Sequence, residues 1–221
     1  WLFVAWSIPY SPIDDFQWGM EDGLRWWLGG LLNGRYVGNL FSILMCRFQL
    51  GKVIVGGGTM FVIPVLSAAL AARGERANFL PALLLCNSCV LLMSDIMWQS
   101  VYGWVSGLSI YGVSAMLFLL WLLTLRRVER ERKHPRAWGG LLLGFTLALG
   151  MFVENLTLLV LGGSVILALY SLRNRELRLP FFACMLGAAL AMLPMFCNSV
   201  VRDLASSGSA IHGLRNLIFQ P

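Results

Sequence analysis

The sequence predicts an all-α fold, a polytopic bundle of transmembrane helices, and three observations lead to this prediction. The 221 residues are 58% hydrophobic and 13% charged, with a mean hydropathy of +0.72. Soluble domains carry about 25% charged residues, so a soluble fold of this length has too little polar surface for its apolar side chains. Apolar runs of membrane-spanning length also recur along the chain, and short basic loops separate them.

The predicted helices follow from the apolar runs in chain order. The first run, Trp1–Ile8, is shorter than the roughly 20 residues that a spanning helix needs, and we expect it to be the outer half of a truncated first span. Six complete spans are expected after it: Val53–Ala72, Phe79–Trp98, Ser109–Leu125, Trp138–Val153, Leu156–Leu172 and Leu179–Phe196. Together they predict one membrane domain over residues 1–221, the N-terminal fragment of a longer protein, with residues 9–52 as an outer loop.

The basic residues predict how the chain is threaded. Of the 17 Lys and Arg residues, 11 lie in three loops, 73–76, 126–136 and 173–178. The positive-inside rule places these loops in the cytoplasm. The net charge of +6 is therefore a topology signal, and no nucleic-acid partner is expected.

The stretch from Trp138 to Leu172 tests this threading. As one helix it would be about 52 Å long, far more than the roughly 30 Å hydrocarbon core requires. Because both of its flanks are basic, it must cross an even number of times. We therefore expect two short helices that turn at Glu154-Asn155 on the outer side.

Most acidic residues fall on that same outer side, facing the periplasm or the exterior. The seven are Asp14, Asp15, Glu21, Asp22, Asp95, Glu154 and Asp203. The Asp14-Asp15 pair has two interpretations. It can form a turn and cap the next helix, or one carboxylate can act as a general base while the other orients it or binds a divalent cation. No other cofactor and no metal cluster is expected.

Other outer residues suit a phosphate-linked lipid substrate. The segment Asp22–Leu32, with Trp26-Trp27, predicts an interfacial helix. Arg35 and Arg202 are candidate phosphate contacts because a guanidinium matches phosphate oxygens, although Arg202 can equally snorkel to headgroups. Lys52 and Arg47 are interpreted as ordinary interfacial charges.

Aromatic and hairpin residues complete the candidate site. Trp104 and Tyr111 suit stacking on a sugar ring, although an aromatic belt explains them almost as well. Glu154, a lone acid at a hairpin tip, requires a partner, which Arg35 or Arg202 can supply. The five cysteines, including the Cys86/Cys89 pair in an apolar helix, are interpreted as packing residues.

Several short motifs, taken in order, resemble one known pattern. They are the proline-containing stretch that ends in Asp14-Asp15, Asn33-Gly-Arg-Tyr36, Trp104-Val-Ser-Gly-Leu-Ser-Ile-Tyr111, Glu154-Asn155 and Pro194 with Asn198 and Arg202. The set resembles an uncharacterised bacterial polytopic membrane family, related to GtrC-type O-antigen glucosyltransferases and to the wider GT-C class. Two departures are Ser109, where family members often carry Asn, and Pro-Met-Phe-Cys-Asn, where a compact Pro-Gly-Asn is usual.

The resemblance implies a GT-C-like glycosyltransferase of the cell envelope. The enzyme would move a sugar from a polyprenyl-phosphate donor to a surface glycan or lipid acceptor, at the periplasmic face of the bacterial inner membrane. The essential acid of such enzymes would fall on Asp14 or Asp15. Substrate contacts would come from Asn33, Arg35, Tyr36, Trp104, Tyr111, Glu154, Asn155 and Arg202.

Two other functions compete with sugar transfer. A transporter or flippase for lipid-linked glycans would usually show an internal repeat and polar residues at mid-membrane, and the sequence shows neither clearly. An O-antigen ligase or polymerase would also use arginines on the outer face.

Overall fold

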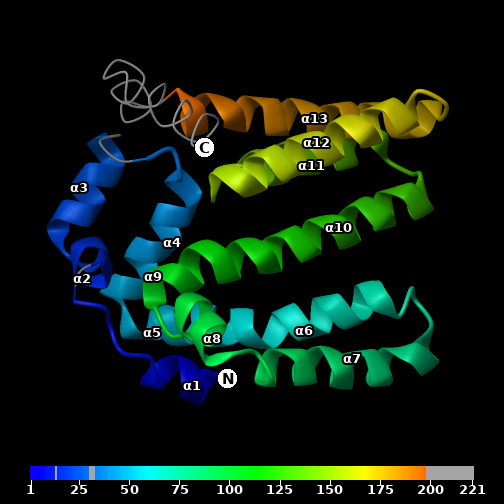
Figure 1. Ribbon diagram of the computed structural model, residues 1–221. Helices are drawn as coiled ribbons and strands as arrows, with labels where there is room; N and C mark the ends of the chain where they lie inside the picture. The colour runs from blue at the N-terminus through cyan, green and yellow to red at the C-terminus, as the bar shows by residue number, and fades with distance from the viewer. Residues whose placement is uncertain (13, 30–32, 198–221) are drawn as a thin grey trace, which may run out of the picture.

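The computed structural model describes residues 1–12, 14–29 and 33–197, and it is helical, with no strand in this part of the chain. Six long helices form the body of the molecule, and Figure 1 shows them running roughly side by side. They are α6 (Gly57–Ala71), α7 (Arg76–Leu91), α10 (Val113–Glu131), α11 (Pro135–Leu149), α12 (Glu154–Ser171) and α13 (Arg175–Phe196).

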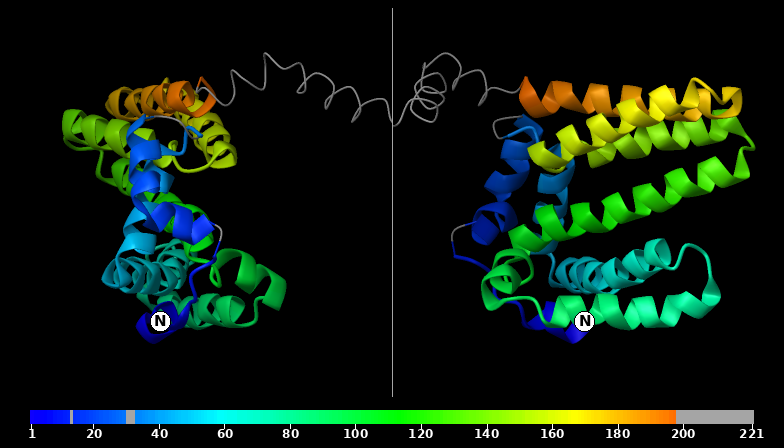
Figure 2. Two further views of the ribbon diagram at one scale, coloured as in Figure 1. Left: turned by 90° about the vertical axis from the view of Figure 1, so that its left-hand side faces the viewer. Right: turned by 45° about the vertical axis from the view of Figure 1, so that its right-hand side comes forward.

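Short helices gather at one end of this body, on the left of Figure 1. They are α1 (Leu2–Ser7), α2 (Asp14–Gly19), α3 (Glu21–Gly29), α4 (Tyr36–Arg47), α5 (Gln49–Gly51), α8 (Asp95–Val101) and α9 (Val105–Gly107), with two π-helical turns, η1 (Lys52–Gly56) and η2 (Leu108–Gly112). Figure 2 shows α2, α3 and α4 lying across the ends of the long helices. This end holds most of the predicted site residues.

The helices confirm the all-α prediction and, in part, the predicted spans. Four continuous helical segments are long and apolar enough to cross a membrane, which is consistent with a membrane protein: Gln49–Ala71, Val105–Glu131, Glu154–Ser171 and Arg175–Phe196. A fifth crossing is reached only if α7 and α8, bent by 94° at their junction, count as one span. The predicted count of six complete spans is not reproduced, and α11 has only 15 residues.

The break between α7 and α8 corrects the predicted span Phe79–Trp98. Ser94 is the N-cap of α8, and its side chain accepts a hydrogen bond from the backbone N–H of Met97 at 3.4 Å. Ser is a favoured N-cap residue and Asp is favoured in the first turn, so Ser94-Asp95 starts a new helix. Asp95 is therefore an exposed first-turn residue of α8, not an acid inside a longer span.

The predicted loop 126–136 is also corrected, because α10 continues through Glu131. The apolar run ends at the first arginines, but the helical backbone continues beyond them. Arg127 Nε and Glu131 Oε1 lie 2.6 Å apart, an ion pair between residues four apart that supports the helix. The arginines at this end are therefore presented on a helix.

The predicted hairpin between Trp138 and Leu172 is confirmed. It consists of α11 and α12, and the turn spans residues 150–153, so Glu154 is the first residue of α12 rather than part of the turn. The Thr157 hydroxyl donates to the carbonyl of Gly150 at 2.6 Å and ties the new helix to the turn.

Lys52 differs from its interpretation as an interfacial charge, since its side chain is buried, with 2% exposure. Its ammonium donates to the carbonyls of Ile8 at 2.8 Å and Trp6 at 3.3 Å, and it lies 4.3 Å from the ring centroid of Tyr10. The carbonyls at a helix C-terminus attract cations. Lys52 therefore fastens the end of α1 against η1.

The three basic connections, α6–α7, α10–α11 and α12–α13, lie together at the end opposite the short helices (Figure 1). This arrangement agrees with the prediction that they share one side. The molecule thus has an arginine-rich end and an end made of short helices.

Candidate functional site

Asp15 is the centre of the polar contacts at the short-helix end. Its side chain is buried, with 1% exposure. Oδ2 accepts from the backbone N–H of Ser11 at 2.7 Å, and Oδ1 accepts from the backbone N–H of Ser106 at 2.8 Å and from the Ser106 hydroxyl. The carboxylate thus joins α2 to α9 across 91 residues of sequence.

Serine hydroxyls extend this network toward α4. The Ser109 hydroxyl donates to the carbonyl of Ser106 at 2.8 Å and lies 2.6 Å from the hydroxyl of Ser42. All three serines are buried. The small Ser109 side chain makes this contact directly. The sequence analysis missed Ser42 and Ser106; an i, i+3 pair of serines in an apolar run was the available signal.

A cavity of about 360 Å³ opens beside Asp15. It is lined by Tyr10, Asp15, Phe16, Gly19, Met20 and Cys46; we call it the Asp15 cavity. A carboxylate offers about four acceptor positions. Oδ2 accepts one hydrogen bond, from Ser11, so its second acceptor position has no partner among the described residues.

The cavity's other titratable groups remain protonated at neutral pH. Burial, followed by the negative charge of Asp15, raises the pKa of the Cys46 thiol to about 12. Burial also raises the pKa of Tyr10, with smaller contributions from Cys46 and Asp15. Because thiolate is the nucleophilic form, Cys46 is not suited to nucleophilic catalysis here. It instead donates to Asp15 Oδ1, at 3.7 Å.

Asp14 does not line the Asp15 cavity. The cavity is lined by residues 15, 16 and 19, which lie on one face of α2, and by Met20, which follows the helix. Asp14 precedes that face by about 100° of helical rotation and is only partly buried. The structure therefore separates two carboxylates that the sequence analysis treated as interchangeable.

Arg35 and Glu154 form the second polar cluster. Arg35 Nε lies 2.9 Å and 3.1 Å from the two Glu154 oxygens, and Nη2 lies 2.8 Å from Oε2. This forked ion pair joins the start of α4 to the start of α12. It identifies Arg35 as the partner predicted for Glu154, while the other candidate, Arg202, lies outside the described residues.

The Asn33-Gly-Arg-Tyr36 motif builds the junction around this pair. Asn33 Oδ1 accepts from the backbone N–H of Arg35 at 3.2 Å and from Asn39 Nδ2 at 3.0 Å. Gly34 packs so closely on the backbone of Pro194 in α13 that a Cβ atom would overlap it. The carbonyl of Tyr36 accepts from Trp27 Nε1 at 2.7 Å and holds α3 to α4.

The two clusters lie at opposite ends of α4. Arg35 precedes the helix and Cys46 is near its last residue, and a rise of 1.5 Å per residue places them about 16 Å apart. A hydroxyl that attacks a sugar and the phosphate that leaves it share one anomeric carbon. If Asp15 orients the acceptor hydroxyl, Arg35 is therefore too far along α4 to bind the phosphate of the sugar donor.

The remaining predicted residues do not line the Asp15 cavity. Trp104 is half-buried, and its indole N–H has no hydrogen-bond partner in the described part of the chain. Tyr111 and Asn155 are exposed. Among the residues that the structure describes, no three His, Cys, Asp or Glu side chains gather as a metal-binding set.

No family model, curated protein or solved structure matches this chain. The fold and site therefore define it by class only: an all-helical protein with several helices of membrane-spanning length and a buried carboxylate beside a cavity at one end.

Proposed function

We propose that this chain is part of a membrane glycosyltransferase that moves a sugar from a polyprenyl-phosphate donor to a glycan or lipid acceptor, with the Asp15 cavity as the acceptor site. The observation that carries the proposal is the Asp15 carboxylate, which is buried, accepts hydrogen bonds from four donors, and lines a cavity of about 360 Å³. Among the described residues, the second acceptor position of Oδ2 has no partner.

The chemistry follows from that open position. The acceptor hydroxyl donates to Oδ2 and attacks the anomeric carbon, the bond from that carbon to the phosphate oxygen breaks, and the electron pair leaves with the lipid phosphate. The hydroxyl proton passes to Asp15. The exposed side chains of Phe16 and Met20 give the cavity an apolar wall suited to a lipid.

In this proposal Arg35 and Glu154 are positioning residues. Their ion pair fixes the start of α4, and Cys46 at the other end of α4 bonds to Asp15. The active face is periplasmic in this proposal, because the positive-inside rule puts the arginine-rich loops on the opposite, cytoplasmic side. The bacterial inner membrane is what the resemblance to GT-C enzymes implies.

The test compares Asp15→Asn with Asp14→Asn, two changes of the same size and charge on adjacent residues. The full-length protein is reconstituted with a labelled polyprenyl-phosphate sugar and an acceptor mixture, and product formation is measured. Loss of a general base typically costs about 10²–10⁴-fold. We expect at least the lower loss for Asp15→Asn and a change of less than about threefold for Asp14→Asn, because Asp14 lies off the cavity face.

Equal rates for the wild type and Asp15→Asn would reject the catalytic role of Asp15. Thermal unfolding of each variant in detergent separates lost chemistry from lost folding. Ser106→Ala, which removes one donor to Asp15 but keeps the carboxylate, should retain part of the activity.

A flippase for lipid-linked glycans is the second candidate, and the 94° bend between α7 and α8 favours it, since transporters use broken helices at substrate sites. In that case the reconstituted wild type forms no glycan product and instead moves the labelled lipid between leaflets.

A further inference from the structure

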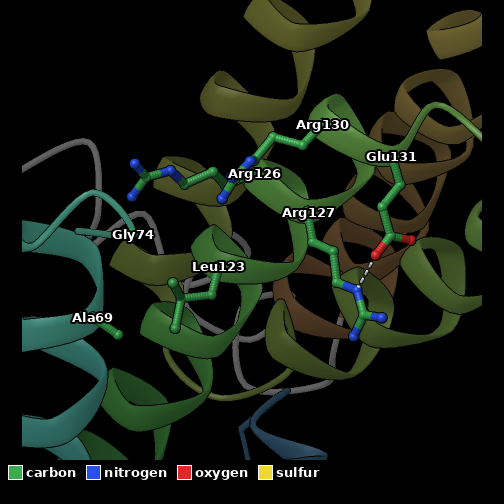
Figure 3. Close-up of a pocket in the computed structure, with 7 residues that line it drawn as sticks. All are labelled: Ala69, Gly74, Leu123, Arg126, Arg127, Arg130 and Glu131. Carbon is green, nitrogen blue, oxygen red and sulfur yellow. Dashed lines mark hydrogen bonds and ion pairs between the residues drawn. The ribbon is translucent and has the colours of Figure 1, made fainter. Parts of the chain in front are cut away.

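A second cavity, of about 580 Å³, lies at the arginine-rich end (Figure 3). It is an open cavity between the end of α6, the α6–α7 turn and the last turns of α10. Its lining residues are Ala69, Gly74, Leu123, Arg126, Arg127, Arg130 and Glu131; we call it the arginine cavity. The mechanism proposed for the Asp15 cavity does not use it.

The lining carries more positive than negative charge. The carboxylate in the lining, Glu131, forms an ion pair with Arg127. Arg126 and Arg130 have no ion-pair partner among the described residues. Arg126 gives one N–H to the carbonyl of Leu70, at 3.2 Å, and an arginine has five such donors. Most of the donors on these two guanidinium groups are therefore available.

Geometry brings these two groups together. Residues 126 and 130 are four apart on α10, so they share one face of the helix, and Figure 3 shows both side chains extending to the side where the α6–α7 turn carries Gly74. Like charges at this spacing repel each other. An anion bound between them replaces that repulsion with two charge-assisted contacts.

Gly74 shapes the other wall of the arginine cavity. Its φ of 90° is a conformation that glycine adopts without steric cost. A Cβ atom at this position would lie 3.5 Å from Nη1 of Arg130, so the turn closes directly over that guanidinium.

The cavity also has an apolar side. Ala69 and Leu123 belong to the membrane-length segments Gln49–Ala71 and Val105–Glu131. The arginine cavity thus lies where apolar helix surface meets a row of cations. A ligand that fits both parts is an anion with a hydrocarbon tail.

We propose that the arginine cavity binds the headgroup of an anionic phospholipid, with Arg126 and Arg130 on the phosphate and the acyl chain against Leu123 and Ala69. This site is independent of the proposed sugar transfer. It goes beyond the general attraction of basic loops to a membrane, because it assigns the binding to two named arginines on one helix face.

The test measures lipid binding by native mass spectrometry of the purified full chain, titrated after delipidation with phosphatidylglycerol or with zwitterionic phosphatidylcholine. The test variant is Arg126→Gln/Arg130→Gln. The control is Arg132→Gln/Arg136→Gln, which removes the same charge from the same stretch but lies outside the cavity lining. We expect phosphatidylglycerol binding to weaken at least about tenfold in the test variant and less than about twofold in the control.

Equal weakening in both double variants would overturn the proposal, because binding would then follow net charge alone. Equal affinity of the wild type for the two lipids would also overturn it. Inorganic phosphate that displaces the lipid at equal concentration would identify a free-phosphate site and reject the lipid. If losing the Arg126–Leu70 hydrogen bond prevents folding, Arg130→Gln against Arg132→Gln decides with the same criteria, since the Arg130 side chain makes no hydrogen bond or ion pair to the described residues.

Discussion

Two buried charges, Asp15 and Lys52, define the short-helix end at the scale of single residues. Removing an ion from water costs several kcal/mol unless hydrogen bonds and an opposite charge compensate for it. Asp15 accepts hydrogen bonds from two backbone N–H groups, the Ser106 hydroxyl and the Cys46 thiol. The Lys52 ammonium donates to two backbone carbonyls and interacts electrostatically with Asp15. Each buried group therefore has polar partners in place of the water that it loses.

The raised pKa of Cys46 gives a residue-scale prediction. A thiol with a pKa of about 12 is only about one part in 10⁴ thiolate at pH 8, and the thiolate is the form that alkylates. Iodoacetamide treatment followed by peptide mass mapping should therefore modify exposed Cys197 well before Cys46. Because the deprotonated fraction grows with pH, modification of Cys46 should rise steadily between pH 8 and pH 11.

Asp15→Asn supplies the control for that prediction. Burial is the larger cause of the raised pKa, but the carboxylate of Asp15 adds to it, so removing the charge should lower the pKa and speed the alkylation of Cys46. Alkylation of Cys46 at the rate of Cys197 in the wild type would show that the thiol is neither buried nor beside a negative charge.

At the scale of elements, α11 and α13 pack backbone to backbone. A Cβ atom on Gly187 of α13 would lie 2.5 Å from the carbonyl oxygen of Leu143 and 3.2 Å from the backbone nitrogen of Leu147. Small residues at helix contacts allow this approach, which is common where helices associate in membranes.

We therefore expect Gly187→Ala to destabilise the protein by about 1–3 kcal/mol, the usual cost of overpacking. Gly144→Ala on α11 is the matched control, because nothing lies within 4 Å of its added Cβ atom and alanine favours a helix. Chemical unfolding of both variants in detergent measures the difference. Equal stability of the two variants would mean that α11 and α13 are not in close contact.

At the scale of the whole molecule, the polar chemistry is divided between two ends. The Asp15 cavity and the Arg35–Glu154 pair lie at the short-helix end, and the arginine cavity lies at the other. Membrane-length helices connect the two ends, and many of their large apolar side chains are exposed, as expected for surfaces that face hydrocarbon.

This division predicts opposite sidedness for the two ends. Gln17 and Glu129 are both exposed, so a cysteine at either position is accessible to a reagent on its own side. In intact cells, with Cys89 and Cys197 replaced by Ser, an impermeant maleimide should label Gln17→Cys. Glu129→Cys should react only after permeabilisation, because basic loops stay in the cytoplasm. Labelling of both positions from outside would reject the arrangement and the proposed periplasmic face.

The sequence alone determined the helical class, the α11–α12 hairpin and the clustering of basic loops, because each depends only on composition and on the spacing of charges along the chain. It also singled out the Asp14-Asp15 pair, without choosing between the two, and predicted Arg35 as one of two partners for Glu154. It misplaced helix ends at Ser94 and at Arg126, since a cap or an i, i+4 ion pair overrides hydropathy there.

Only the tertiary structure decided which residues meet. Asp15 and Ser106 are 91 positions apart, and no local pattern encodes a contact made when α9 packs beside α2. The structure also separated Asp15 from Asp14 and placed Arg35 at the far end of α4, because helical rotation and helix length fix where side chains lie. The candidate residues could be predicted from their residue types and local motifs, but which of them share a site depends on packing between helices that are distant in the sequence.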